Sequence, residues 1–138
     1  MQNSSTAAAR VRAPRMTILV AEDHLDSRDA LRALLEAFGY CVLEAVNGRE
    51  AIEVALTGHP DLILMDIMMP EMDGFEATRQ LRRHPATAHT PIIAVTAMEG
   101  AQRLALLAGA NDYERKPVDI RRLVAKVHDL LDVPAPTP

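Results

Sequence analysis

The stretch DLILMDIMMPEMDG, residues 61–74, decides the fold, because an apolar run ends abruptly at an acid and turn residues follow. Residues 62–65 are apolar without alternation, which is typical of a strand covered on both faces of a parallel sheet. Pro70 and the pair Asp73 and Gly74 then force a turn before another helix begins. We therefore expect Asp66 at the carboxyl edge of a buried sheet, where ligands bind in open parallel sheets. A lone Asp at a strand end can also cap a turn or a helix, so the other residues of the chain are needed to distinguish these roles.

Length and composition indicate one soluble domain. The chain has 138 residues, one cysteine and a net charge of −4, so neither a disulfide framework nor a thiolate metal site is expected. The apolar runs are far shorter than the roughly 20 residues of a membrane span, and residues 1–15 lack the apolar core of a secretory signal. We expect a cytoplasmic protein with no membrane span. Because the only charges in residues 1–15 are arginines, the remainder is more acidic than the total, which argues against nucleic-acid binding.

Hydrophobic spacing predicts five strands that alternate with five helices. The strands are expected at residues 16–21, 40–45, 62–65, 92–95 and 111–115. The helices are expected at residues 26–38, 51–56, 75–81, 99–108 and 118–131. Asp26 or Ser27 is the predicted cap of the first helix, and Gly39 its stop. This alternation implies an α/β fold with a doubly wound, five-stranded parallel sheet and helices on both faces. Residues 1–15 are interpreted as a flexible leader and residues 132–138 as a Pro-rich tail.

The residues that follow four of these strands have the chemistry of a phosphoryl-transfer site. The topology gathers five of them at one edge of the sheet: Glu22, Asp23, Asp66, Thr96 and Lys116. Three carboxylates repel one another unless a cation compensates, and oxygen ligands without Cys or paired His suit Mg²⁺. A metal-bound Asp beside a lysine and a hydroxyl is what phosphoryl transfer requires, and the carboxylate itself can be the nucleophile. A cis Lys116–Pro117 bond is predicted to aim the lysine inward, the alternative being a surface lysine.

In their order and spacing these motifs resemble the receiver domain of two-component response regulators. Single-domain members of the chemotaxis type and the cell-cycle type are included in the resemblance, which covers residues 16–131. It is carried by the segments VAED (20–23), DLILMD (61–66), MP (69–70), MDG (72–74), VTA (95–97), GA (109–110), DY (112–113) and KP (116–117). The family has a flavodoxin-like fold and is not a class of turnover enzymes. The resemblance therefore implies a stand-alone regulator that signals through a phosphorylation-dependent protein surface.

By this resemblance, Asp66 accepts a phosphoryl group from the phosphohistidine of a histidine kinase or a histidine phosphotransfer protein. The resemblance also implies a Mg²⁺ site. Its ligands would be Asp23, Asp66 and the backbone carbonyl of Met68, with Glu22 acting through a water.

The resemblance further assigns the residues that bind the phosphoryl group and transmit its arrival. Thr96 and Lys116 would hold the phosphoryl oxygens. Tyr113 matches the aromatic residue that swings inward when the threonine moves, which changes the face read by a downstream protein target. Simple packing of Tyr113 is the alternative.

Two departures from the family pattern fall on that face. The segment 96–109 is shorter than the usual spacing, so its loop and the first turn of its helix are expected to differ. Glu114 and Arg115 are charged where the strand is commonly apolar, and we expect these charges to reach solvent or a partner. Such charges disfavour a tight apolar dimer contact, so a monomer or a weak dimer is expected.

Two other functions compete with the receiver interpretation. Haloacid-dehalogenase-like phosphatases also use a strand-end Asp and Mg²⁺, but they need a second acid two residues later, where this chain has Met68. A binding-only pseudo-receiver would lack an acid, the acceptor or the lysine. None of these residues is missing here.

Overall fold

The computed structural model describes residues 15–131, so the predicted leader and tail, apart from Arg15, lie outside the described residues. The strands are β1 (Thr17–Ala21), β2 (Cys41–Ala45), β3 (Leu62–Asp66), β4 (Ile92–Thr96) and β5 (Asp112–Arg115). The helices are α2 (Leu25–Ala37), α3 (Gly48–Gly58), α4 (Gly74–Arg83), α5 (Ala101–Ala108) and α6 (Ile120–Leu131). None of these helices is both long enough and apolar enough to cross a membrane.

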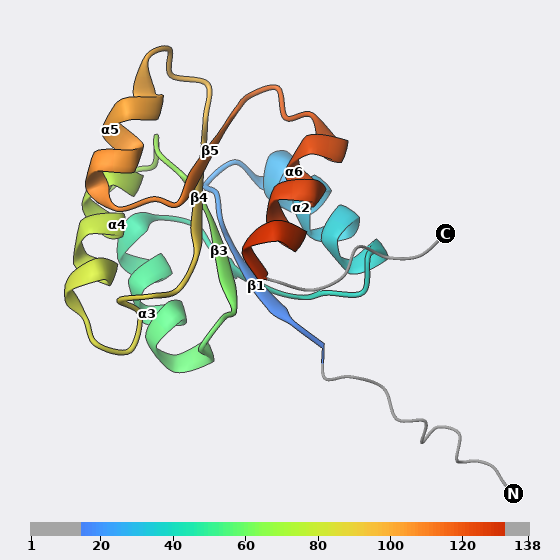
Figure 1. Cartoon of the computed structure of the whole chain (residues 1–138), viewed down its shortest axis with the longest axis horizontal. Helices are drawn as coiled ribbons and strands as arrows, with labels where there is room; N and C mark the ends of the chain where they lie inside the picture. Colours follow the sequence, from blue (N-terminus) through green and yellow to red (C-terminus); the bar gives the residue numbers. More distant parts are fainter. Residues whose placement is uncertain (1–14, 132–138) are drawn as a thin grey trace, which may run out of the picture.

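The five strands form one parallel sheet in the order β2-β1-β3-β4-β5. Helices α3, α4 and α5 cover one face of the sheet, and α2 and α6 cover the other (Figure 1). The predicted doubly wound, five-stranded fold is confirmed. Strand β3 lies in the middle and is buried along its whole length, as its unbroken apolar run predicts.

Each face of the sheet has its own apolar core, because successive side chains of a strand point to opposite faces. Leu19, Ile63 and Met65 pack towards α3, α4 and α5. Ile18, next to Leu19 in β1, and Leu64, next to Ile63 in β3, pack towards α2 and α6. The two cores hold the strands from both sides and keep the strand ends in fixed positions.

The strand register brings the candidate site residues to the same level of the sheet. Ala21 pairs with Met65, so the residues that follow, Glu22 and Asp66, lie at the same edge. Asp66 pairs with Val95, which places Thr96 next along β4. The register of β5 against Thr96 then positions Lys116 immediately beyond Arg115.

The predicted cap of the first helix is wrong. Helix α2 begins at Leu25, and His24 takes the cap position without a side-chain cap bond. The start is earlier because Glu22 organises the turn after β1: its Oε2 accepts the His24 N–H at 3.0 Å. The His24 carbonyl then accepts the Arg28 N–H at 2.9 Å, which closes the first helical turn before Asp26 or Ser27 could act as a cap.

Helix α5, in contrast, begins later than the sequence predicts. The prediction started it at residue 99, whereas the helix begins at Ala101. Gly100 has a φ of 76°, a left-handed conformation that ends the loop after β4 and that glycine adopts without strain. Gly109 ends the helix, as predicted.

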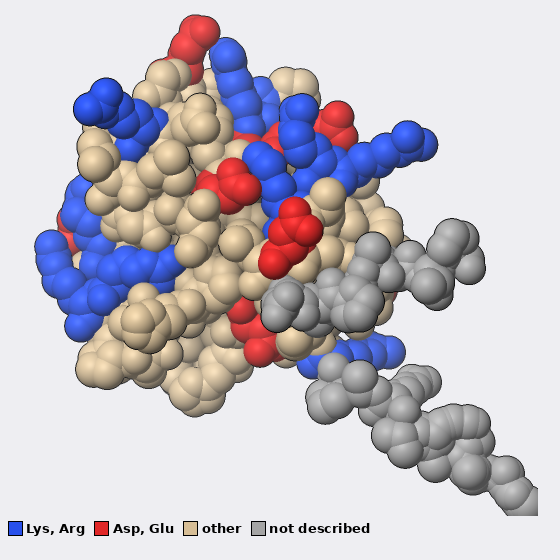
Figure 2. Space-filling view, in the orientation of Figure 1, with Lys and Arg blue, Asp and Glu red and all other residues tan. Residues whose placement is uncertain are grey.

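Glu114 does not reach solvent; its charge reaches two ionic partners on α6, which is one of the two outcomes expected from the sequence. Its side chain is only 1% exposed, and it lies 3.0 Å from the Arg122 Nε and 3.0 Å from the Lys126 Nζ, both on α6. A buried carboxylate is tolerated when it is paired and hydrogen-bonded in this way. Arg115 is exposed, as predicted, and pairs with Glu99 at 3.7 Å. Figure 2 shows basic side chains gathered over β5 and α6 with acidic ones between them.

Candidate functional site

Three carboxylates meet at the carboxyl ends of β1 and β3. Glu22 and Asp23 follow β1, and Asp66 is the last residue of β3. One oxygen from each carboxylate lies within 4.8 Å of the others. Glu22 and Asp66 are buried and Asp23 is exposed, so the cluster is open on the Asp23 side. The structure therefore brings together the three acids that the sequence predicts.

Lys116 supplies the positive charge of this cluster. Its Nζ donates to Glu22 Oε1 at 2.7 Å and to Asp66 Oδ2 at 3.2 Å. The Lys116–Pro117 peptide bond is cis, and the lysine side chain points into the sheet edge rather than out to solvent. One ammonium faces three carboxylates, which leaves the site with a net negative charge.

The pKa values of the buried groups reflect this imbalance. Burial, followed by the negative charge of Glu22, raises the pKa of Asp66 from 3.8 to about 6 against the opposing effect of Lys116. Burial also pushes the pKa of Glu22 upward, but the Lys116 ammonium and the His24 N–H outweigh it, and the pKa of Glu22 is lowered. For Lys116, burial is outweighed by Glu22 and Asp66, so its pKa is raised. The Lys116 ammonium therefore balances the negative charge of Asp66 only in part, which favours the binding of a cation beside this carboxylate.

The loop after β3 is fixed by close backbone contacts. The Met68 N–H donates to Asp66 Oδ1 at 3.3 Å, while the Met68 side chain points outward. The Gly74 N–H donates to the Ile67 carbonyl at 2.8 Å, and a Cβ on Gly74 would collide with the Asp66 carbonyl oxygen. Only glycine fits there. The loop thus keeps Asp66 and the Met68 backbone at the mouth of the site.

Thr96 and Tyr113 meet at a shared neighbour, Met98. Thr96 is buried at the end of β4, and its Oγ1 accepts the Met98 N–H at 3.1 Å. The Tyr113 hydroxyl donates to the Met98 carbonyl at 3.3 Å. Tyr113 is partly buried and packs against the core beneath α5. A hydrogen-bonded path therefore runs from the site edge to β5.

The hollow above the acids has a volume of about 300 Å³. It is lined by residues at the ends of β1, β3, β4 and β5 and at the start of α2, namely Glu22, Asp23, His24, Ser27, Asp66, Met68, Thr96, Ala97 and Lys116. All the predicted site residues except Pro117 and Tyr113 line it, and Tyr113 connects to it through Met98. Oxygen donors with one exposed carboxylate suit a hard divalent cation such as Mg²⁺.

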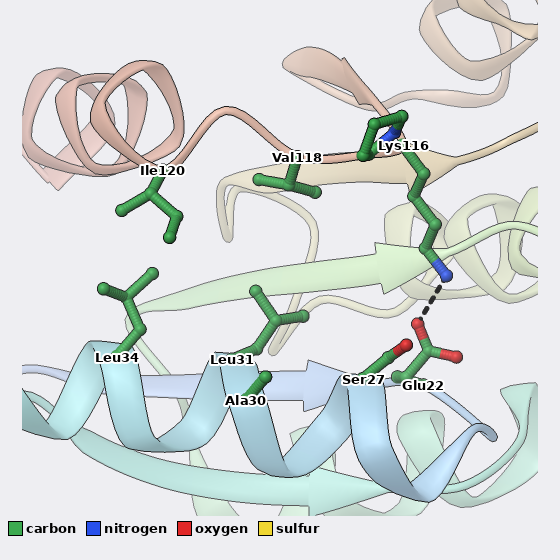
Figure 3. Close-up of a pocket in the computed structure, with 9 residues that line it drawn as sticks. Glu22, Ser27, Ala30, Leu31, Leu34, Lys116, Val118 and Ile120 are labelled. Atoms are coloured by element: carbon green, nitrogen blue, oxygen red, sulfur yellow. Dashed lines mark hydrogen bonds and ion pairs between the residues drawn. The ribbon is translucent and has the colours of Figure 1, made fainter.

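A second, apolar groove of about 270 Å³ joins this hollow. Leu31 and Leu34 of α2 face Val118 and Ile120 across it (Figure 3). Glu22, Ser27 and Lys116 line both spaces. The groove was not anticipated from the sequence, because it arises where the start of α6 meets α2.

One polar contact at the site was also missed by sequence reasoning. Arg28 on α2 donates through Nη1 to the Glu22 carbonyl at 2.9 Å and through Nε to Glu44 Oε1 at 2.9 Å. The charge of Glu44 in an otherwise apolar strand was a signal that a cation from a neighbouring helix would meet it.

Fold and site together define a class: a doubly wound domain with an acid cluster, a lysine and a threonine at the carboxyl edge of its sheet. Comparison with known proteins gives the family. The family model of the response regulator receiver domain matches residues 18–128. This chain therefore belongs to the response regulator receiver family.

Individual relatives agree with this assignment. The chain is 36% identical over 117 residues to the polar-differentiation response regulator DivK of Brucella ovis, covering 83% of this chain and 95% of DivK. The receiver domain of a sensor histidine kinase from Pseudomonas aeruginosa, with a magnesium ion coordinated in its active-site cleft, has a TM-score of 0.81 and 33% identity, covering 86% of this chain and 99% of that one.

A third comparison involves a complex. The receiver domain of the Saccharomyces cerevisiae response regulator Ssk1 was crystallised with the histidine phosphotransfer signaling protein Ypd1. The matched chain has a TM-score of 0.76 and 31% identity, covering 85% of this chain and 89% of that one. The chemotaxis response regulator CheY4 of Vibrio cholerae is also similar, with a TM-score of 0.79 and 27% identity, covering 85% of this chain and 99% of that one. The likeness to DivK and CheY4 favours neither the phosphatase nor the pseudo-receiver interpretation.

Proposed function

We propose that Asp66 is the phosphoacceptor of this receiver domain. The observation that carries the proposal is the contact of the buried Asp66 carboxylate with Lys116, beside two further acids within 4.8 Å. One carboxylate oxygen forms a bond to phosphorus while the bond from phosphorus to the donor's histidine nitrogen breaks, and the imidazole leaves with that electron pair. The product is an aspartyl phosphate and a free histidine. No turnover is required, because the protein carries the group as a signal.

The acid cluster fits a Mg²⁺ site built by Asp23, Asp66 and the Met68 backbone carbonyl. When bound, Mg²⁺ would neutralise charge on the transferred phosphoryl oxygens. Both Glu22 carboxylate oxygens already accept hydrogen bonds, from Lys116 and from the His24 N–H. An indirect role for Glu22, through a water, suits this arrangement. The exposed Asp23 carboxylate is the most accessible of the three.

Lys116 and Thr96 would hold the phosphoryl oxygens after transfer. The Lys116 ammonium already reaches Asp66, so it can move to a phosphoryl oxygen over a short distance. The Thr96 hydroxyl accepts from Met98, and its own hydrogen is available to donate. A shift of Thr96 would disturb Met98 and, through the Met98 carbonyl, the Tyr113 hydroxyl. Tyr113 would then change the face made by α5, β5 and α6, which we propose a downstream protein reads.

The apolar groove is the place where we propose that the phosphohistidine donor docks. For a donor that presents its histidine on a helix, the groove offers an apolar strip that fits a helix face. The strip is continuous with the site, since Glu22 and Lys116 line both. A helix seated there would have its histidine close to Asp66.

Further properties belong to the same proposal. We propose that residues 16–131 act as the receiver domain of a cytoplasmic response regulator. Its partners would be proteins and not nucleic acid. With Glu114 engaged by α6 and Arg115 exposed and charged, the protein would be a monomer or a weak dimer.

Transfer from a phosphorylated histidine phosphotransfer protein tests the proposal. The wild type should take up the phosphoryl group in the presence of Mg²⁺, and Asp66→Asn should not. Ile120→Arg, in the groove, should slow this transfer but leave phosphorylation by acetyl phosphate unchanged. Leu107→Arg is the matched control, because Leu107 is exposed on α5, away from the groove. Equal transfer to wild type and Asp66→Asn would refute the acceptor assignment, and equal slowing by both arginine variants would refute the docking site.

A further inference from the structure

Arg28 joins the acid cluster to the edge of the sheet. It lies on α2, and its side chain is only 12% exposed. Its guanidinium donates to the Glu22 carbonyl and to the Glu44 carboxylate of β2, each at 2.9 Å. The Glu22 contact is to the main chain and not to the acid group, so Arg28 is not a partner of the cluster's charge.

Glu22 is held at every polar atom. Its N–H donates to the Ala45 carbonyl at 3.0 Å, and its two carboxylate oxygens accept from Lys116 and from the His24 N–H. The remaining group is the Glu22 carbonyl, and Arg28 provides its hydrogen bond. Glu44 fixes the Arg28 guanidinium, and the guanidinium in turn fixes the direction of the Glu22 carbonyl.

The direction of this carbonyl constrains the placement of Asp23. The Glu22 carbonyl and the Asp23 N–H belong to one planar peptide unit, so fixing the carbonyl fixes the plane from which Asp23 departs. Within residues 15–131, no hydrogen bond reaches the Asp23 carboxylate, which is exposed. The backbone is therefore the main constraint on that carboxylate.

We propose that Arg28 is a positioning residue of the metal site. It acts through the Glu22–Asp23 peptide, with Glu44 as its anchor, and holds the Asp23 carboxylate within reach of Asp66. This inference rests on the proposed function, since it takes the acid cluster as the Mg²⁺ site. Outer residues that orient metal ligands typically affect metal affinity about 10- to 100-fold.

Arg32 offers a matched control. It lies one turn further along α2 and donates to the same Glu44 carboxylate, at 2.6 Å to Oε2. Its side chain is 41% exposed, and its other ionic partner is Asp29. Arg32→Met therefore removes an arginine from Glu44, as Arg28→Met does, but leaves the Glu22 carbonyl bonded.

Two measurements on the whole chain test the inference. Titration calorimetry gives the Mg²⁺ Kd, and NMR without metal gives the chemical shift of the Asp23 amide. Arg28→Met should weaken Mg²⁺ binding roughly tenfold and shift the Asp23 amide. Arg32→Met should leave both at their wild-type values. Arg28→Lys should fall between wild type and Arg28→Met, because a single ammonium can reach the carbonyl but cannot bridge to Glu44 with the fixed guanidinium geometry.

The outcomes separate this inference from the proposed function. If the wild type binds Mg²⁺ and the Arg28 variants bind it as Arg32→Met does, Arg28 has no positioning role and the acceptor proposal is untouched. If the wild type does not bind Mg²⁺, both are overturned. If Arg28→Met does not fold, the Arg28→Lys variant provides the test. Wild-type Mg²⁺ affinity and an unshifted Asp23 amide in Arg28→Lys would overturn the inference. Weaker Mg²⁺ binding and a shifted Asp23 amide in Arg28→Lys would support it.

Discussion

Replacement of Asp66 by Asn should stabilise the metal-free protein at neutral and alkaline pH. The pKa of Asp66 is raised from 3.8 to about 6 by burial and by Glu22, so the folded state disfavours the ionised carboxylate. A tenfold change in an acid constant corresponds to about 1.4 kcal/mol, so ionised Asp66 costs the fold on the order of 3 kcal/mol. Asn carries no charge and removes this cost.

The pH dependence follows from the direction of the pKa change. Well below pH 3.8 Asp66 is protonated in both the folded and the unfolded chain, and it costs nothing. Between that value and about 6 the unfolded chain loses the proton first, so stability falls as the pH rises. Above that range the full cost is present. The advantage of Asp66→Asn should therefore be small at pH values below 4 and reach about 3 kcal/mol by pH 8.

Urea unfolding in the presence of a chelator measures this difference. The chain has no tryptophan, so far-ultraviolet circular dichroism is the appropriate signal. Asp129→Asn makes the same chemical change at an exposed position of α6 and should show no comparable gain. Added Mg²⁺ should reduce the advantage of Asp66→Asn, because the cation stabilises the ionised acid. An Asp66→Asn protein that is no more stable than wild type at pH 8, or equally stabilised at low pH, would show that the cluster is not electrostatically strained.

Three further predictions test the metal site, the buried ion pair and the assembly state. Asp23→Ala should weaken Mg²⁺ binding in titration calorimetry while raising metal-free stability, since one of three crowded charges is removed; unchanged affinity would remove Asp23 from the site. Lys126→Met should lower the free energy of unfolding in urea by roughly 2–3 kcal/mol, because buried Glu114 and the Tyr113 carbonyl both lose a donor. Arg122→Met should lower it by less than about 1 kcal/mol, because Arg122 is exposed. Equal losses of stability in the two variants would contradict the burial argument. Sedimentation at micromolar concentration should find a monomer or weak dimer with and without beryllofluoride, and a tight dimer that forms only with it would mean that the charges of β5 do not oppose association.

The sequence was sufficient for the fold and for the residues at the strand ends. In a doubly wound parallel sheet, the topology alone brings the residues after each strand to one edge, so Asp66 and Lys116 were paired without knowledge of any distance. The apolar run before Asp66 also placed β3 in the buried centre of the sheet.

Contacts that depend on the placement of a helix could not be predicted from the sequence. The sequence left open whether Glu114 reaches solvent or a partner, because Arg122 and Lys126 belong to a later helix whose distance from β5 no local pattern determines. The Arg28 contact with Glu44 has the same origin, since α2 must lie at one particular angle across β1 and β2. The helix cap was wrong for a different reason: a side chain before the helix, that of Glu22, competes with the local capping residues.

The central claim is that Asp66 receives the phosphoryl group. It is tested most directly by incubating the protein with acetyl phosphate and Mg²⁺ and then locating the modification by proteolysis and mass spectrometry. We predict a single phosphoryl group on the peptide that contains Asp66, absent when a chelator replaces Mg²⁺ and absent from Asp66→Asn. A phosphoryl group on the wild-type peptide that contains Asp23, or the same gain in Asp66→Asn, would contradict the assignment.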